Sequence, residues 1–261
     1  MDAAACIRHS EVNITMIRGN AMPLELLTIP CLSDNYAFLL VNAAGEAALI
    51  DAPEAAPINA ALAERGLALT TILLTHHHWD HVEGLEGLNT ALAPRVIGAK
   101  ADAHRLPPLT EEVSEGGRIT VLGEEVDILD VSGHTIGHIA FYFPASGFVF
   151  TGDSLMAFGC GRLFEGTPDQ MYHSLAKLAA LPDDTLVCSG HEYTSSNARF
   201  AASVMPDVPA IASRSAETDR LRRADQFTVP STLALEKATN PFMLATDAKS
   251  FAALRAQKDV F

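Results

Sequence analysis

Short apolar runs separated by turn residues follow one another from Met22 to about residue 191, and this pattern predicts a series of β-strands. The densest run, residues 36–41, has the length of a strand and falls far short of the ~18 apolar residues of a membrane-spanning helix. The predicted strands cover residues 24–29, 37–41, 47–50, 71–74, 96–99, 118–121, 126–131, 138–143, 148–151 and 186–188.

Helical patterns interrupt this series and replace it near the C-terminus. One helix is predicted over residues 57–65, where Pro57 suits the first turn and Gly66 suits the end. Another begins at Thr167 and Pro168, with apolar residues along one face. Beyond about residue 192 the strand pattern stops, and the sequence predicts helices over residues 195–205, 209–226, 231–238 and 247–258.

Together these elements predict an α/β fold. Two β layers with helices outside them, a four-layered αβ/βα sandwich, would be followed by a small C-terminal helical domain. We assign residues 22–191 to the sandwich, as the catalytic domain, and residues 192–261 to the helical domain. Residues 1–21 have neither this periodicity nor the apolar stretch of a secretory signal, and we interpret them as a disordered N-terminal extension.

Charge and cysteine content narrow the choice of partner and compartment. The chain has 18 Lys and Arg against 32 Asp and Glu, a formal net charge of −14, so it repels phosphate backbones and nucleic acid is not expected as a partner. The four cysteines lie far apart and form no CxxC pair, which indicates a reducing compartment, the cytoplasm. We expect a monomer that does not associate with membranes.

The strongest chemical signal is the segment THHHWDH at residues 75–81, directly after a predicted strand. Imidazole and carboxylate are ligands that zinc and related divalent metals prefer. In an extended segment residues two apart point the same way, so His76 and His78 can bind one ion. If the chain then turns, Asp80 and His81 face a second ion, whereas His77 points away and is expected to have a supporting role.

Three further polar residues follow predicted strands: His134, Asp153 and His191. Each comes after a glycine, which permits a tight turn. Any one of these pairs alone is typical of an ordinary turn, but HxHxDH is not explained by packing, because clustered imidazoles repel one another when protonated. Seven candidate ligands exceed the needs of one tetrahedral ion. We therefore predict two sites joined by Asp153, namely His76/His78/His134 and Asp80/His81/His191. The histidines at positions 9, 104, 138 and 173 are interpreted as surface or core residues.

The order HxHxDH, SGHT, TGD and GHEYT resembles that of the metallo-β-lactamase superfamily, and within it the chain is similar to the glyoxalase II, or hydroxyacylglutathione hydrolase, family. The similarity runs from about residue 26 to the C-terminus and includes SDNY, GCGR, FEGT and NPFM. The metal motif specifies only the superfamily, whereas GCGR, GHEYT and the terminal RAQK are much more specific. The resemblance implies an αββα sandwich with a binuclear site, the same division of ligands, and a helical domain that helps to hold glutathione.

The resemblance also nominates substrate contacts. A glutathione thioester carries carboxylates, so an acidic protein needs a local basic pocket to bind it. The nominated residues are Arg162, Tyr193, Arg255 and Lys258, with Phe164 as a packing contact. Arg255 and Lys258 are three apart and share one face of a helix. Some family members carry Lys at the position of Arg162, and some carry Tyr at that of Phe164, so one possible hydrogen bond to glutathione is absent.

The implied reaction is hydrolysis of S-D-lactoylglutathione and related 2-hydroxyacylglutathione thioesters to glutathione and D-lactate, a step in methylglyoxal detoxification. Two divalent ions are expected, zinc first, with iron or manganese as alternatives. They would supply a bridging hydroxide that attacks the thioester carbonyl. Asp153 is expected to orient this hydroxide, and Asp80 to act mainly as a ligand. A thiol with a pKa of about 8.5 leaves as its anion, so a dedicated general acid is not required.

Three other interpretations remain open at this point. A persulfide dioxygenase has a related fold with a single iron, and it would be expected to lack the pair Arg255 and Lys258. A β-lactamase is disfavoured because the chain has no secretory signal, retains Asp80 and has a long helical tail. A non-catalytic, metal-stabilised binding module is disfavoured because all seven ligand positions are present.

Overall fold

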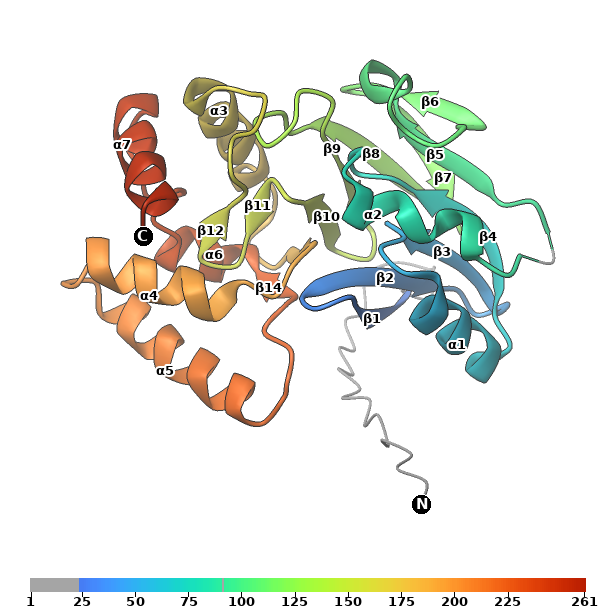
Figure 1. The fold of residues 1–261 in the computed structure, drawn as a ribbon, viewed down its shortest axis with the longest axis horizontal. Helices are drawn as coiled ribbons and strands as arrows, with labels where there is room; N and C mark the ends of the chain where they lie inside the picture. Colours follow the sequence, from blue (N-terminus) through green and yellow to red (C-terminus); the bar gives the residue numbers. More distant parts are fainter. Residues whose placement is uncertain (1–23, 91) are drawn as a thin grey trace.

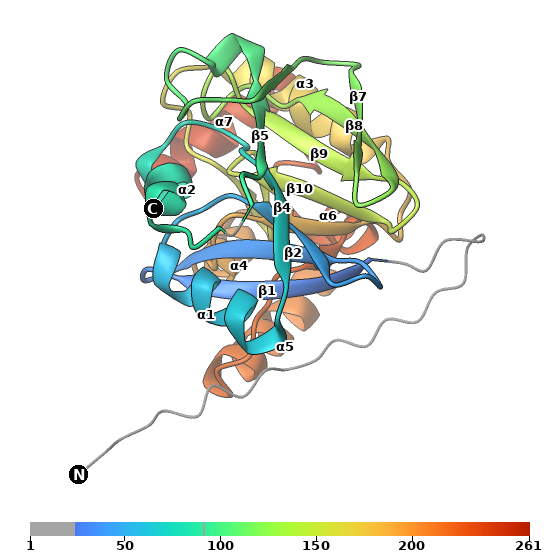
Figure 2. The same ribbon diagram turned by 90° about the vertical axis from the view of Figure 1, so that its right-hand side faces the viewer.

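The computed structural model describes residues 24–90 and 92–261, which form two six-stranded β-sheets with helices on their outer sides (Figures 1 and 2). The first sheet has the strand order β1-β2-β3-β4-β5-β6. Strand β2 is antiparallel to both β1 and β3, and the neighbouring pairs from β3 to β6 are parallel. Its strands are β1 (Glu25–Cys31), β2 (Asn35–Val41), β3 (Glu46–Ile50), β4 (Ala68–Leu73), β5 (Arg95–Ala99) and β6 (Glu111–Val113).

The second sheet has the order β14-β13-β10-β9-β8-β7, in which only β10 and β13 pair in parallel. Its strands are β7 (Arg118–Val121), β8 (Glu124–Asp130), β9 (Ile139–Phe143), β10 (Phe148–Gly152), β13 (Leu186–Ser189) and β14 (Ser231–Thr232). A small hairpin, β11 (Leu155–Met156) with β12 (Gly159–Cys160), follows β10.

The continuous apolar run of β2 is explained by burial on both of its faces. Tyr36, Phe38 and Leu40 belong to the core between the two sheets, where the rings of Phe38 and Phe150 lie 5.5 Å apart. The alternate residues of β2 belong to a second core, under the outer helix α1. All seven residues of β2 are buried, as is usual for a strand covered on both sides.

Helices cover the outer face of each sheet. Helix α1 (Ala55–Arg65) packs on the first sheet through Ile58 and Leu62, and it ends at Gly66, whose φ of 63° is left-handed. Helices α3 (Pro168–Ala179) and α7 (Ala248–Asp259) lie on the second sheet, where Met171 and Phe251 join one apolar core. Thr167 caps α3 in a capping box with Gln170. The predicted four-layered sandwich is confirmed.

The C-terminal part consists mainly of helices, namely α4 (Thr194–Val204), α5 (Pro209–Arg223), α6 (Leu233–Thr239) and α7. The prediction that strands end near residue 192 is wrong at Ser231–Thr232, which forms β14 beside β13. A two-residue strand shows no apolar periodicity, so the sequence pattern could not reveal it. The domain boundary at residue 192 stays a prediction, and the interpretation of residues 1–21 concerns a segment outside the described residues.

All ten predicted strands occur, with ends that shift by up to three residues. Short elements complete the fold: α2 (Trp79–Val82) and the 3-10 helices η1 (Glu83–Gly87) and η2 (Lys100–Asp102). Within the described part of the chain, no helix is both long and apolar enough to cross a membrane.

Candidate active site

The seven predicted ligands come together at one edge of the sandwich, because each lies just beyond the carboxyl end of a strand. The segment 76–81 follows β4 of the first sheet. In the second sheet, β8, β10 and β13 run in the same direction, so the residues that follow them meet at one edge. These residues are His134 after β8, Asp153 after β10 and His191 after β13.

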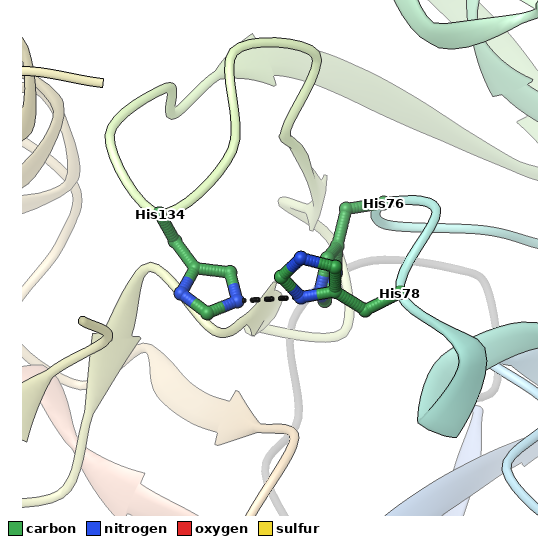
Figure 3. Close-up of side chains that lie close together, drawn as sticks. All are labelled: His76, His78 and His134. Atoms are coloured by element: carbon green, nitrogen blue, oxygen red, sulfur yellow. Dashed lines mark hydrogen bonds between the residues drawn. The ribbon is translucent and has the colours of Figure 1, made fainter. Parts of the chain in front are cut away.

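Three imidazoles form the first triad, defined as His76, His78 and His134. Nδ1 of His78 lies 3.1 Å from Nε2 of His76 and 2.9 Å from Nε2 of His134. Figure 3 shows the ring of His134 reaching from its own loop toward the two rings of the 76–81 segment. The alternation that predicted a shared ion for His76 and His78 is therefore matched by their convergence.

The second triad, defined as Asp80, His81 and His191, lies beside the first. Its ligand atoms are all within 4.8 Å of one another. Oδ2 of Asp80 is 3.4 Å from Nε2 of His191 and 3.9 Å from Nε2 of His81. The short helix α2 supplies the predicted turn, since it begins at Trp79 and carries Asp80 and His81.

Asp153 stands between the triads. Its Oδ2 is 3.4 Å from Nε2 of His134 and 3.3 Å from Nε2 of His191, and its Oδ1 is 3.4 Å from Nε2 of His81. Four ligands at about 2.0–2.1 Å around a tetrahedral zinc ion are separated from one another by about 3.4 Å. The spacing around Asp153 is thus that of ligands that share ions.

Two buried polar atoms show that the cluster fits a cation. Nε2 of His81 and Oδ1 of Asp153 are buried, and neither has a hydrogen-bond partner among the described residues. Buried polar atoms in native proteins nearly always have partners, and a metal ion would satisfy both of these. Imidazole and carboxylate donors in this arrangement form a site for divalent metal.

In the second triad, the imidazole nitrogens that face away from the site are held by carboxylates; we call such nitrogens the outer nitrogens. Nδ1 of His81 donates to Asp51 at 2.8 Å, and Nδ1 of His191 donates to Asp34 at 3.0 Å. Carboxylates only accept, so Nδ1 carries a proton and Nε2 is the nitrogen directed at the site. Asn35 donates to the Asp80 carboxylate at 3.1 Å and fixes its direction.

In the first triad, the outer nitrogens of His76 and His134 are held by neutral oxygens. Nδ1 of His134 donates to the carbonyl oxygen of Arg162 at 2.7 Å, and Nδ1 of His76 lies 3.0 Å from the hydroxyl of Thr75. That hydroxyl donates to Asp51 at 2.8 Å, so it accepts from His76. Both Nε2 atoms are therefore free to bind an ion.

The two triads also differ in the pKa values of their residues. Burial and the neighbouring His134 lower the pKa of His78 to about 4. For His191 burial also lowers the pKa, but the charge of Asp153 and hydrogen bonds to Asp153 and Asp80 outweigh it and raise the pKa to about 10. Burial opposes ionisation of Asp153, yet His191 and His81 hold its pKa well below the usual range. The second triad is the more negative environment, with the greater need for a positive charge.

His138 was interpreted as a surface or core residue, and the structure places it against the site. Its ring stacks on that of His76 with centroids 4.5 Å apart, and its Nε2 accepts a hydrogen bond from the backbone N–H of Asp153 at 3.1 Å. The interpretation missed this supporting role. The repeat of Gly-His at residues 133–134 and 137–138 was the available signal.

The glycine before His191 is required by close approach of the backbone. A Cβ atom on Gly190 would lie 2.6 Å from Cε1 of His81 and 2.8 Å from Oδ1 of Asp153. Any larger residue would push into both triads. At Gly152, before Asp153, the φ of 47° adds the left-handed turn that the sequence suggested.

A pocket of about 550 Å³ opens beside the triads, and all five predicted substrate contacts line it. These are Arg162, Phe164, Tyr193, Arg255 and Lys258. Trp79, Met156, Cys160 and Asn197 also line the pocket and were not predicted as contacts. Burial raises the pKa of Cys160 to about 11, so this thiol is not a nucleophile at neutral pH.

One wall of the pocket is basic. Arg255 is only 6% exposed and is fixed by the carbonyl oxygen of Cys160 at 3.0 Å and by Asp259 at 2.9 Å. Arg162 lies 3.8 Å from the same carboxylate of Asp259, and Lys258 contacts Ser196. Asp259 thus faces two cations, Arg255 and Arg162, and with Lys258 the wall keeps a net positive charge on an acidic protein.

Aromatic rings flank the triads on the pocket side. Phe164 packs edge-on against His78 and His134, with centroids 5.6 and 5.3 Å away. Tyr193 stacks on His191 at 4.6 Å with nearly parallel planes. Both rings also line the pocket, and the packing of Phe164 against the substrate stays a prediction.

Comparisons with known proteins agree with this arrangement. A model described as "Metallo-beta-lactamase superfamily" matches residues 33–191, and one described as "Hydroxyacylglutathione hydrolase C-terminus" matches residues 192–261. A hydroxyacylglutathione hydrolase of Ruegeria pomeroyi is 61% identical over 255 residues, 92% of this chain and 100% of the relative. One of Cereibacter sphaeroides is 56% identical over 255 residues, with coverage of 92% and 100%.

A solved structure, that of TTHA1623 in a di-iron-bound form, shares the fold with a TM-score of 0.60 and 27% identity, covering 83% of this chain and 98% of that one. The matches to sequence relatives extend over both the sandwich and the C-terminal helices. The chain therefore belongs to the hydroxyacylglutathione hydrolase family of the metallo-β-lactamase superfamily.

Proposed function

We propose that this protein hydrolyses S-D-lactoylglutathione and related 2-hydroxyacylglutathione thioesters to glutathione and D-lactate, as a cytoplasmic step of methylglyoxal detoxification. One observation carries the proposal: two ligand triads joined by Asp153 open into a pocket with a basic wall. Such a pocket suits a thioester whose leaving group is an anionic peptide. The names of the relatives support the same substrate class.

The proposed cofactor is a pair of divalent ions, zinc in the first instance, with three ligands in each triad and Asp153 shared. TTHA1623, which has the same fold, is described with two irons, which supports the number but leaves iron as an alternative to zinc. When bound, such ions lower the pKa of coordinated water toward about 7 and polarise a carbonyl oxygen.

The chain's own residues then orient the reactants. Oδ1 of Asp153 is free of hydrogen bonds within the described residues, and as a carboxylate it can accept one from the attacking water. Asp80 is held by Asn35 and His191, which leaves it a ligand rather than a base. The leaving thiol, with a pKa of about 8.5, departs as its anion, so no general acid is needed to protonate the leaving group.

The basic wall positions the substrate in this proposal. Arg255, Lys258 and Arg162 would hold the carboxylates of glutathione, and the thioester would then lie between Phe164 and Tyr193, next to the triads. Arg255 and Lys258 both face the pocket from α7, and these are the residues whose absence we expected of a persulfide dioxygenase.

Hydrolysis of S-D-lactoylglutathione, followed as loss of the thioester absorbance, tests the proposal. We expect turnover that a chelator abolishes and that added zinc restores. Absence of turnover by metal-loaded protein would contradict it, and oxygen consumption with a glutathione persulfide would identify the dioxygenase instead. Hydrolysis of a β-lactam without thioester hydrolysis would favour the lactamase interpretation.

A further inference from the structure

A network of charged side chains lies behind the first triad, outside the pocket. Its centre is Asp102, which is 0% exposed at the end of η2. Asp102 accepts hydrogen bonds from Nδ1 of His77 at 2.9 Å and from Nε of Arg105 at 2.6 Å. We call Asp102, His77, Arg105 and Glu165 the Asp102 network.

Glu165 extends the network to two further loops. Both of its carboxylate oxygens accept from the guanidinium of Arg105, and Oε2 also accepts from the backbone N–H of Ile136 at 2.8 Å. Nε2 of His77 lies 3.7 Å from Oε1 of Glu165, which closes the ring of contacts. The hydrogen bond from Arg105, together with its charge, holds the pKa of Glu165 below its usual value, so the pair stays ionised at neutral pH.

The network joins the segments that carry the first triad and the substrate contacts. His77 lies between His76 and His78, and Ile136 is two residues after His134. Glu165 follows Phe164 directly in the loop of residues 161–166, which also carries Arg162. None of the four network residues lines the pocket, so they can act on it only through their neighbours.

The backbone at Gly137 lies in close contact with Asp102, the centre of the network. A Cβ atom on Gly137 would lie 2.5 Å from Cβ of Asp102, so the loop after His134 has no room to move toward η2. The pair of Arg105 and Glu165 is partly exposed, at 30% and 25% of the side chains, and such a pair alone stabilises little. Its anchor is the buried Asp102, whose charge requires both of its partners.

We propose that Glu165 is a positioning residue for the thioester substrate. Through Arg105 and Asp102 it holds the loop of residues 161–166, with Arg162 and Phe164, against the segment 76–81 that supplies the first triad. The substrate named here rests on the proposed function, whereas the loop contact does not. Loss of the Glu165 charge therefore loosens substrate binding more than it slows the chemical step.

Glu165→Gln tests this proposal, because the amide keeps the size of the side chain and an acceptor for Ile136 but removes the charged acceptor of Arg105. We expect the KM for S-D-lactoylglutathione to rise about threefold to tenfold, with kcat within about twofold of the wild type. The control is Glu111→Gln. It breaks a comparable exposed pair with Arg95 at 2.6 Å, at 38% and 44% exposure and away from the pocket, and it should leave both constants unchanged.

A second measurement uses Trp79, the single tryptophan of the chain, which lies two residues after His77 and is 62% exposed. Quenching of its fluorescence by acrylamide needs no substrate. We expect stronger quenching in Glu165→Gln than in the wild type or in Glu111→Gln. If the wild type fails to hydrolyse the thioester, the proposed function fails, and quenching alone decides on Glu165. An unchanged KM, a loss confined to kcat, or quenching equal to that of the wild type would overturn the proposal.

Discussion

The two triads share Asp153 but are held in place by different means. The first triad consists of imidazoles alone, and the outer nitrogens of His76 and His134 donate to a hydroxyl and a backbone carbonyl. The second contains a carboxylate, and its imidazoles donate to Asp51 and Asp34. Outer carboxylates make an imidazole a stronger ligand, so the second triad depends on charge and the first on backbone position.

Asp51 partly connects the two arrangements. It accepts from His81 directly, and it accepts from the backbone N–H and the hydroxyl of Thr75, which in turn contacts His76. Asp34 supports only His191 among the ligands. A substitution of Asp51 should therefore disturb both triads, whereas a substitution of Asp34 should disturb only the second.

The largest effect is expected from Asp153→Ala, which removes the one side chain that both triads share. We expect kcat to fall by more than about a hundredfold, with less metal bound in both triads. Metal analysis and thioester hydrolysis on the same sample measure both effects. Asp127→Ala, at an exposed pair with Arg118, is the control and should change neither. Full metal content together with wild-type turnover would contradict the shared role.

Replacing Asp51 and Asp34 one at a time distinguishes the contributions of the two triads to metal binding. Asp51→Asn should weaken metal binding about tenfold to a hundredfold, because it withdraws support from His81 and, through Thr75, from His76. Asp34→Asn should weaken binding less and only in the second triad, since Asp34 is more exposed. Competition with a chelator measures the two affinities. Equal losses in both variants would show that the triads are not held differently.

The proposed role of the basic wall is to bind the substrate rather than the metal. Lys258→Ala and Arg255→Ala should each raise the KM for a glutathione thioester about tenfold, with a smaller effect on kcat and none on metal content. Arg223→Ala, an exposed arginine on α5, is the control. An unchanged KM in both variants would mean that the assigned glutathione pocket is wrong.

The smallest effect is a pH dependence. Burial, with the charges of Arg255 and Arg199, lowers the pKa of Lys258 from its usual 10.5. As the pH rises through this lowered pKa, Lys258 loses its charge and its attraction for a carboxylate, so KM should increase at a lower pH than an ordinary lysine would cause. The increase should vanish in Lys258→Ala. If it persists there, another group is responsible.

The grouping of the seven proposed ligands could be predicted from the sequence because each stands just beyond an apolar strand. The alternation of His76 and His78 and the glycines before His134, Asp153 and His191 are local signals. The outer partners are not local: Asp51 lies 30 residues before His81, and Asp34 lies 157 residues before His191. Such pairs depend on which strands become neighbours, and periodicity does not determine strand order.

The same dependence on which strands become neighbours explains why part of the pocket wall was not predicted. The hairpin of β11 and β12 consists of two-residue strands without an apolar pattern, yet it brings Met156 and Cys160 to the pocket wall. His138 and the Asp102 network join segments that are far apart in the sequence, as in the contacts of His138 with His76 and of Arg105 with Glu165. The family resemblance nominated the five proposed substrate contacts, which charge and spacing alone did not distinguish from exposed helix ends.

The central claim is that both triads must hold a metal ion for thioester hydrolysis. The most direct test is to titrate metal-free protein with zinc and to measure bound metal and S-D-lactoylglutathione hydrolysis in each sample. We expect activity to reach its maximum only when about two ions are bound per chain. Full activity with a single ion bound, or activity that survives complete removal of metal, would contradict it.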